Sequence, residues 1–235
     1  MSELISTQDF HRAVGVEGWR IVAGGPTVHY RTGTYAAGAV LVQAIIGLGT
    51  AGGHEPHVDL RHEGVTVRLP IFGPEGDGFA GEYAEVAQHI SAAARELGLQ
   101  ADPSVPQTLQ FAVDAMVPPD VAPFWRAVLG GYIDRDDEYD LIDPHWRQPA
   151  INFGQMDVPR PQRNRIHINV YVPYDQAEPR IRAALAAGGH IVTDQFAPSW
   201  WVLADCEGNE VCVAPIGWEG DVPTFTRSST PGRFG

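Results

Sequence analysis

The spacing of apolar and polar residues predicts a complete small domain in residues 1–99. Residues 65–69 (VTVRL) alternate apolar and polar side chains, as a half-buried strand does. Residues 81–97 repeat apolar side chains on one helical face and end before Gly98, a residue typical of helix C-termini. The full set of expected elements comprises helices at 6–13, 35–48 and 81–97 and strands at 19–22, 27–30, 58–61 and 65–69. After the short first helix, this order predicts a ββαββα arrangement over a four-stranded antiparallel sheet.

The segment 35–48 (YAAGAVLVQAIIGL) is apolar on nearly all sides. This pattern predicts a buried helix, and the run is too short to span a membrane. Since one antiparallel sheet does not cover every apolar face of such a helix, we expect part of it to be buried against a second copy of the chain. The prediction is a homodimer formed mainly through this domain, with Val40 or Ile45 as candidate contact residues.

An internal repeat follows a linker. Residues 100–107 contain two prolines and show no periodicity, which is typical of a linker. Beyond them, VPPDVAP at 117–123 recurs as VPYDQA at 172–177, a period of 55 residues. Each copy follows a strand, opens a helix that ends in two glycines, and precedes three short strand candidates. The pattern predicts a tandem βαβββ repeat.

The two repeat units are expected to pair into a curved sheet with a cleft between them that holds a small ligand. Their expected elements are strands at 109–116, 139–142, 150–153, 166–172, 200–204 and 210–213 and helices at 124–129 and 181–187. The predicted fold class is therefore α+β in both halves. The expected boundaries are 1–99 for the first domain, 100–107 for the linker, 108–218 for the second domain and 219–235 for a flexible polar tail.

Composition and charge narrow the range of partners. Of the 235 residues, 44% are hydrophobic and 19% are charged, as in globular domains rather than disordered chains. The formal net charge of −13 repels phosphate backbones and anionic lipids, so neither nucleic acid nor a membrane is expected as a partner. The start MSELISTQDFHRAV lacks the basic and then apolar pattern of a signal peptide, which favours the cytoplasm. In that compartment Cys206 and Cys212 are expected to remain thiols.

The densest polar cluster, GHEPHVDLRHEGVTVRL, lies between the apolar helix and a strand. Its His54 and Pro56, the strand at 65–69 and the earlier Trp19 resemble the pterin-4a-carbinolamine dehydratase family, which has a His-His-Pro turn before a Val-x-Val-x-Leu strand. The resemblance spans residues 6–99, roughly. It implies histidines that act as general acid and base in removing water from a hydroxylated pterin.

The chain departs from that family at three places, one of which is Thr50, where the family usually has a glutamate four residues before the first histidine. Glu55 stands where the family has a second histidine, and Ile71-Phe72 stand where a Thr-His pair supplies a third. A carboxylate replaces an imidazole as acid or base near neutral pH only when burial raises its pKa. His54, Glu55 and His57 are therefore the candidate catalytic residues of a hydro-lyase. The alternative is a polar turn that binds a ligand without turning it over.

The second half carries FWRAVLGG after its first strand and ADCEGNEVCVAP near its end, in addition to the tandem repeat. These features resemble the glyoxalase-like branch of the vicinal oxygen chelate family over roughly residues 108–216. The resemblance implies a glyoxalase/bleomycin-resistance-like fold. It also implies that inward-facing strand residues hold one divalent metal, which polarises vicinal oxygens of a substrate.

The metal-site positions of that family correspond to Gln110, His167 and Cys212, although the repeat register aligns Ala112 rather than Gln110 with His167. Cys212 stands where the family has a glutamate. One histidine, one cysteine and neutral amides suit hard divalent ions poorly and are incomplete for zinc. We therefore expect no bound cofactor, and we expect these three residues to line a ligand site. In it His167 forms hydrogen bonds and Cys212 packs as a small hydrophobe.

Trp200 and Trp201 complete the ligand-binding candidates. They are adjacent in a predicted strand, so one faces away from the other and is able to stack on a planar ligand. Three functions stay open: an enzyme, with lyase chemistry, acting on a pterin-like or vicinally oxygenated compound; a non-catalytic protein that sequesters a planar ligand; and an oligomerisation module. In the first two the partner is a small molecule.

Overall fold

The computed structural model describes residues 4–48, 53, 55–71, 79–135, 140–160 and 166–216. Its contacts divide the chain into two compact units. One unit comprises Met1–Gln110 with His145–Pro149, and the other comprises Phe111–Pro144 with Ala150–Gly235. No helix in these described ranges is long and apolar enough to cross a membrane.

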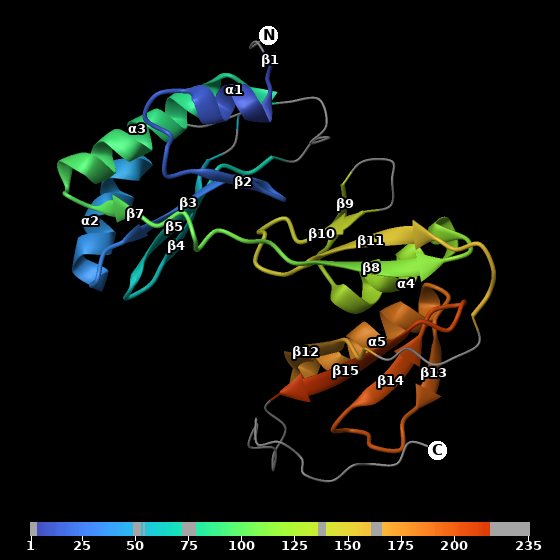
Figure 1. Ribbon diagram of the computed structural model, residues 1–235. Helices are drawn as coiled ribbons and strands as arrows, with labels where there is room; N and C mark the ends of the chain where they lie inside the picture. The colour runs from blue at the N-terminus through green and yellow to red at the C-terminus, as the bar shows by residue number, and fades with distance from the viewer. Residues whose placement is uncertain are drawn as a thin grey trace. The chain divides into compact units, whose positions relative to one another are not determined.

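In the first unit, the main strands and helices follow the order predicted from the sequence (Figure 1). The elements are α1 (Thr7–Arg12), β2 (Arg20–Val22), β3 (Gly25–Arg31), α2 (Tyr35–Ile46), β4 (His57–Leu60), β5 (Gly64–Arg68) and α3 (Glu82–Glu96), with a separate pair formed by β1 (Leu4–Ile5) and β6 (Phe79–Ala80). The main strands pair antiparallel in the order β2-β3-β5-β4. The prediction of an antiparallel sheet with helices is confirmed.

This sheet has a fifth strand that the sequence pattern does not predict. β7 (Gln100–Ala101) pairs with β3, and Ala101 lies opposite Tyr30, although the lack of periodicity assigns these residues to the linker. β2 pairs only with residues 25–27 of β3, so the backbone groups of Tyr30 and Arg31 are left for β7. A two-residue strand is too short to show alternation, which is why the pattern gives no sign of it.

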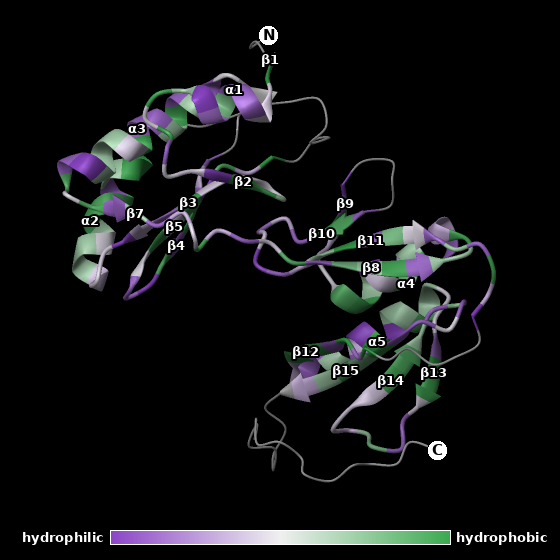
Figure 2. Cartoon of the chain, in the orientation of Figure 1, coloured by the Kyte–Doolittle hydropathy of each residue, from purple (hydrophilic) through white to green (hydrophobic). Residues whose placement is uncertain are grey.

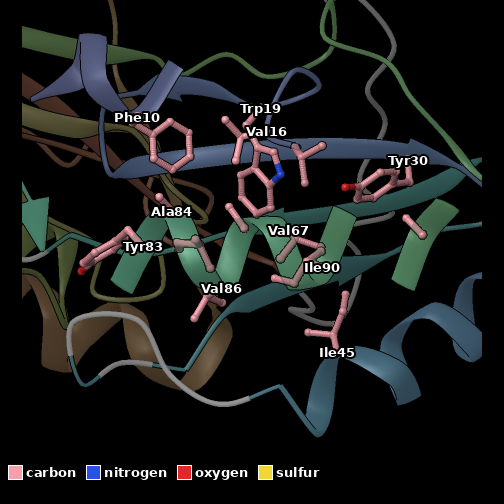
Figure 3. Close-up of a cluster of buried hydrophobic side chains, with 14 of the residues drawn as sticks. Phe10, Val16, Trp19, Tyr30, Ile45, Val67, Tyr83, Ala84, Val86 and Ile90 are labelled. Carbon is pink, nitrogen blue, oxygen red and sulfur yellow. The ribbon is translucent and has the colours of Figure 1, made fainter. Parts of the chain in front are cut away.

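One face of the first sheet carries the hydrophobic core (Figure 3). Phe10 and Trp19 are completely buried in one cluster with Val28 and Val67 of the sheet and Ile90 of α3. Side chains alternate between the two faces of a strand, so the opposite face is polar. The residues that share this polar face are Arg20 of β2, Thr27, His29 and Arg31 of β3, His57 and Asp59 of β4, and Thr66 and Arg68 of β5.

Helix α2 is not the buried helix that its apolar sequence predicts. Only Gly38, Leu41 and Ile45 are buried, at the spacing of one helical face, whereas Val40 is 53% exposed and Ile46 is 71% exposed. In Figure 2, α2 is mostly white to green, while α3 alternates hydrophilic and hydrophobic residues. The helix itself is confirmed, but the described chain packs against only one side of it. The exposed apolar side chains are those that the sequence analysis expects a second copy to cover, and that contact stays a prediction.

The second unit contains the predicted tandem repeat. The first copy comprises β8 (Gln110–Ala115), α4 (Pro118–Leu129), β9 (Ile133–Asp134), β10 (Leu141–Ile142) and β11 (Ala150–Gln155). The second copy comprises β12 (Asn169–Pro173), the 3-10 helix η2 (Tyr174–Gln176), α5 (Ala177–Ala186), β13 (His190–Thr193), β14 (Trp201–Ala204) and β15 (Glu210–Ile216). Each copy is a βαβββ unit, as predicted.

The described strands of the second unit form two separate four-stranded sheets, β8-β11-β10-β9 and β12-β15-β14-β13, rather than the single curved sheet expected. The two copies are joined by a shared hydrophobic cluster in which α4 packs against α5. Both helices begin earlier than predicted, at Pro118 and Ala177. Prolines are tolerated there because the first N–H groups of a helix have no intrahelical acceptor. The cleft expected between the two copies stays a prediction.

Candidate functional site

The structure describes two of the three catalytic candidates in the first unit. His54 lies outside the described residues, as does Phe72. Glu55 is exposed, so it lacks the burial that an acid–base role at this position requires. His57 is half-buried at the start of β4 and lies opposite Arg68 of β5. The described residues therefore offer little support for the expected acid–base pair.

Four of the candidate residues, His167, Trp200, Trp201 and Cys212, lie in or next to strands of the sheet β12-β15-β14-β13. One face of this sheet packs on the hydrophobic cluster through Val172 of β12, Leu203 of β14 and Val213 of β15. Alternation places the neighbouring residues on the opposite face, here called the open face. Its members are Asn169 and Tyr171 of β12, Glu210, Cys212 and Ala214 of β15, Val202 and Ala204 of β14, and His190 of β13, with His167 two residues before Asn169.

Small residues occupy the centre of the open face. Cys212 lies between Asn169 and Val202 on the neighbouring strands, and all side chains of β14 on this face are small or medium-sized. Val202, Ala204 and Cys212 are buried. On the edge strand β12, in contrast, Tyr171 is 61% exposed beside Ala214. The open face therefore has small apolar side chains at its centre and a large, exposed aromatic side chain on its edge strand.

His167 and Cys212 are brought into contact. The Cys212 sulfur lies 3.7 Å from Nδ1 of His167, and the backbone N–H of Cys212 donates to the Ile168 oxygen at 2.9 Å. Gln110 begins β8, in the other sheet, and is exposed. The structure therefore joins two of the three residues at the family's metal positions.

The two adjacent tryptophans face different surroundings. Trp201 begins β14 and packs against the hydrophobic cluster. Trp200 precedes the strand and stacks on Phe196, with ring centroids 4.4 Å apart and planes 19° from parallel. The expectation that the pair divides between two sides agrees with these contacts, and Phe196 is a partner that the sequence pattern did not indicate.

The Asp-x-x-Gly-Asn turn before β15 connects the two copies. The completely buried Asp205 accepts a hydrogen bond from the Trp125 indole at 3.0 Å. The Glu207 carboxylate accepts from the backbone N–H groups of Met116 and Val117 at 2.6 and 2.8 Å, beside the start of α4, where negative charge is favourable. This turn therefore has a structural role within the repeat.

The sequence of residues 110–214 matches the family described as "Glyoxalase-like domain". These residues form a glyoxalase-like domain. The match leaves out residues 1–109, so the resemblance of the first domain to the dehydratase family stays a prediction. None of the curated proteins searched matches the chain.

Several solved structures resemble the glyoxalase-like domain. A glyoxalase/bleomycin resistance protein/dioxygenase family enzyme from Burkholderia phytofirmans is 14% identical, with a TM-score of 0.38, and the alignment covers 46% of this chain and 97% of that one. A glyoxalase/bleomycin resistance protein from Albidiferax ferrireducens is 16% identical, with a TM-score of 0.36 and coverage of 46% and 98%. The fosfomycin resistance protein FosX from Mesorhizobium loti is 8% identical, with a TM-score of 0.37 and coverage of 47% and 91%.

The side chains of the glyoxalase-like domain do not fit a resident divalent metal. The contacting pair His167 and Cys212 provides one nitrogen and one sulfur, and the position at which the family has a glutamate holds Cys212. Across the described ranges, no group of three or more His, Cys, Asp and Glu side chains is arranged to hold a metal ion. Hard divalent cations require oxygen ligands, and zinc requires more ligands than this pair supplies.

The second cysteine of the glyoxalase-like domain is not activated. Although Cys206 is exposed, partial desolvation raises the pKa of its thiol, and the neighbouring carboxylates of Asp205, Glu207 and Asp120 raise it further. Its sulfur also lies 3.7 Å from the Asp120 backbone oxygen. Because the thiolate is the reactive form, Cys206 is a poor nucleophile near neutral pH.

Sequence reasoning missed a polar position in the other sheet of the domain. Asn152 lies in β11 between Ile151 and Phe153, which belong to the hydrophobic cluster, so Asn152 points to the opposite face. Its Oδ1 atom is buried and accepts no hydrogen bond from the described residues. Nearby, a Cβ added to Gly154 would lie 2.5 Å from Oδ1 of Asp114. The alternation of Ile151, Asn152 and Phe153 was the available signal for this position.

Proposed function

We propose that the glyoxalase-like domain binds a small planar organic molecule on the open face of the sheet β12-β15-β14-β13, without a resident metal ion. The observation that carries this proposal is the contrast in side-chain size on that face. Val202, Ala204 and Cys212 provide small, buried side chains at the centre, and Tyr171 stands 61% exposed at the edge. Binding sites for small molecules combine an apolar surface with a few polar groups in this way.

The residues around this centre offer complementary contacts. A planar ring placed over Cys212 and Ala214 would be able to contact the Tyr171 ring, because Tyr171 lies opposite Ala214. His167 and Asn169 would supply hydrogen bonds from the same strand segment. The buried Oδ1 of Asn152, in the other sheet of the domain, is a further polar atom that requires a donor.

We propose sequestration rather than turnover. Two of the metal positions hold a histidine and a cysteine in contact, and the described residues offer no larger set of ligands with which a metal would polarise vicinal oxygens of a substrate. The raised pKa of Cys206 also keeps that side chain in the unreactive thiol form. An enzyme acting on a vicinally oxygenated or pterin-like compound is the alternative.

Titration of the full-length protein with pterin and with catechol, followed by ligand-observed NMR, tests the proposal. At least one of the two probes is expected to bind and to be recovered chemically unchanged. Tyr171→Ser should weaken binding by about fivefold, since an aromatic contact contributes about 1 kcal/mol. Tyr174→Ser is the matched control, because Tyr174 is 55% exposed but lies in η2.

Two results would contradict the proposal. The first is that neither probe binds, and the second is that Tyr171→Ser and Tyr174→Ser weaken binding equally. Conversion of a probe would favour the enzyme instead.

Metal analysis of the purified protein should find less than one equivalent of divalent metal, and stoichiometric metal that disappears in His167→Ala would contradict metal-independent binding.

For residues 1–99 we propose a dehydratase-like domain whose main role is to pair two copies of the chain. The order of strands and helices in the first unit supports the fold, and the exposed position of Glu55 counts against acid–base catalysis. The exposed apolar residues Val40 and Ile46 on α2 support the pairing role.

A further inference from the structure

The polar face of the first sheet contains an arginine whose charge no carboxylate of the described residues balances. Arg68 ends β5 and is half-buried. Its Nε donates to the Thr27 hydroxyl at 3.4 Å, and its Nη1 donates to the backbone oxygen of Trp146 at 3.1 Å. Both acceptors are neutral. Burial lowers the pKa of Arg68, and no neighbouring negative charge in the described ranges opposes that effect.

The described arginines differ in how their charge is compensated, and Arg20 of β2, like Arg68, donates only to neutral acceptors, the backbone oxygens of Glu17 and Trp19. In the same unit, Arg31 forms an ion pair with Asp102, and Arg61 forms one with Asp59. Arg180 of the second unit also donates only to backbone oxygens, but these belong to the last turn of α4, where the helix dipole is negative. Within the ranges that the structure describes, Arg68 donates to neither a carboxylate nor a helix end. A half-buried cation without such compensation is unfavourable unless a ligand supplies the negative charge.

The groups around Arg68 are able to donate hydrogen bonds. The strand register places His57 on one side of Arg68 and Thr27 on the other. Directly opposite residues have Cβ atoms about 5 Å apart, so these side chains are within reach of one small ligand. Thr66 lies two residues along β5 on the same face, and its hydroxyl is 2.9 Å from Nδ1 of His29.

One side of the guanidinium is covered by an aromatic ring, and its outer edge is open. The Trp146 ring centroid lies 5.5 Å from Cζ of Arg68. The Nη2 group of Arg68 donates no hydrogen bond within the described part of the chain, and it is not fully buried. Stacking on Trp146 thus holds the planar guanidinium of Arg68 in place, while the N–H groups of Nη2 are available to a ligand.

We propose that Arg68, with His57 and Thr66 beside it, forms a binding site for an oxyanion carried by a small molecule, either a phosphate or a carboxylate. A fixed guanidinium matches two oxygens of such a group at once. The site belongs to the first unit and does not depend on the ligand proposed for the glyoxalase-like domain.

Isothermal titration of the full-length protein with inorganic phosphate, and separately with acetate, tests the site at constant ionic strength. Saturable binding of at least one anion is expected. Arg68→Gln should weaken it at least about tenfold, because it removes a charge-assisted pair of hydrogen bonds. Arg61→Gln removes the same charge from an exposed ion pair on the same sheet and should change the affinity less than about twofold.

Arg68→Gln also removes the hydrogen bond to the Trp146 backbone oxygen, so its folding needs a check by circular dichroism. Should it fail to fold, Arg68→Lys and His57→Gln replace it, and each is expected to weaken binding about threefold or more, since lysine lacks the planar fork. Binding of phosphate alone indicates a phosphorylated ligand, and binding of acetate alone indicates a carboxylate. Absence of saturable binding of both anions, or equal affinity in wild type and every folded variant, would overturn the proposal.

Discussion

The Asp205 side chain illustrates how single residues hold the two repeat copies together. Its carboxylate is completely buried and accepts hydrogen bonds from the Trp125 indole, the Glu207 and Asn209 backbone N–H groups and the Asn209 side-chain amide. The donor–acceptor distances lie between 2.9 and 3.0 Å. Trp125 belongs to the first copy and the other donors to the second. A buried carboxylate is favourable only when donors compensate it in this way.

Asp205→Ala is expected to lower the free energy of unfolding of the glyoxalase-like domain by about 3 kcal/mol, because it leaves several buried donors without an acceptor. Urea denaturation followed by circular dichroism measures the change. Asp194→Ala removes an exposed carboxylate and should change stability by less than about 0.5 kcal/mol. Equal stability of the two variants would show that the turn is not a structural connection.

Strand β7 shows how an element is held in place by residues just outside it. Asp102 directly follows β7, and its backbone N–H donates to the His29 oxygen at 2.7 Å. Its carboxylate accepts from the Ser104 hydroxyl at 2.6 Å and backbone N–H at 3.0 Å, and from Arg31 of β3. These hydrogen bonds, those of the Ser104 hydroxyl above all, lower the pKa of Asp102 to about 2.

The lowered pKa of Asp102 means that its ionised form favours the folded state. The contribution is therefore present above the ordinary pKa of 3.8 and is lost as the pH falls toward about 2. Ser104→Ala should raise the pKa of Asp102 toward 3.8, because it removes the hydrogen bond with the largest effect. An NMR titration of the Asp102 carboxyl checks this, and an unchanged midpoint would contradict the assignment.

At the scale of the whole molecule, helix α2 presents apolar side chains that its own unit does not cover. Val40 and Ile46 are exposed, whereas Ile45 is 3% exposed and belongs to the core of the first unit. Of the two contact residues expected from the sequence, Ile45 is therefore not available as a contact, because its side chain is already buried. Val40 is the suitable probe of assembly.

The full-length protein is expected to be a homodimer, with twice the chain mass of 25.5 kDa in light scattering at micromolar concentration. Val40→Asp should release monomers, because the dimer would bury an unpaired charge. Val14→Asp is the matched control, since Val14 is 82% exposed and lies after α1 rather than on α2. A wild-type mass of 25.5 kDa would rule out the dimer, and equal dissociation by both variants would rule out α2 as the contact.

The sequence by itself determined the local elements and the repeat. The alternation in VTVRL predicts β5, the helical spacing of apolar residues predicts α3, and the recurrence after 55 residues predicts two βαβββ units. These features depend on neighbouring residues, whose periodicity is written directly in the chain.

Tertiary structure alone decided what packs against each element. It left one side of α2 exposed and placed β7 beside β3. It also joined residues far apart in the sequence, such as Arg68 with Trp146 and Trp125 with Asp205, which are separated by 78 and 80 positions. Such contacts depend on how elements meet in space, and no periodicity along the chain encodes a pair at that separation. The physical reason is that burial and hydrogen bonding are properties of neighbours in space, while a pattern records only neighbours in sequence.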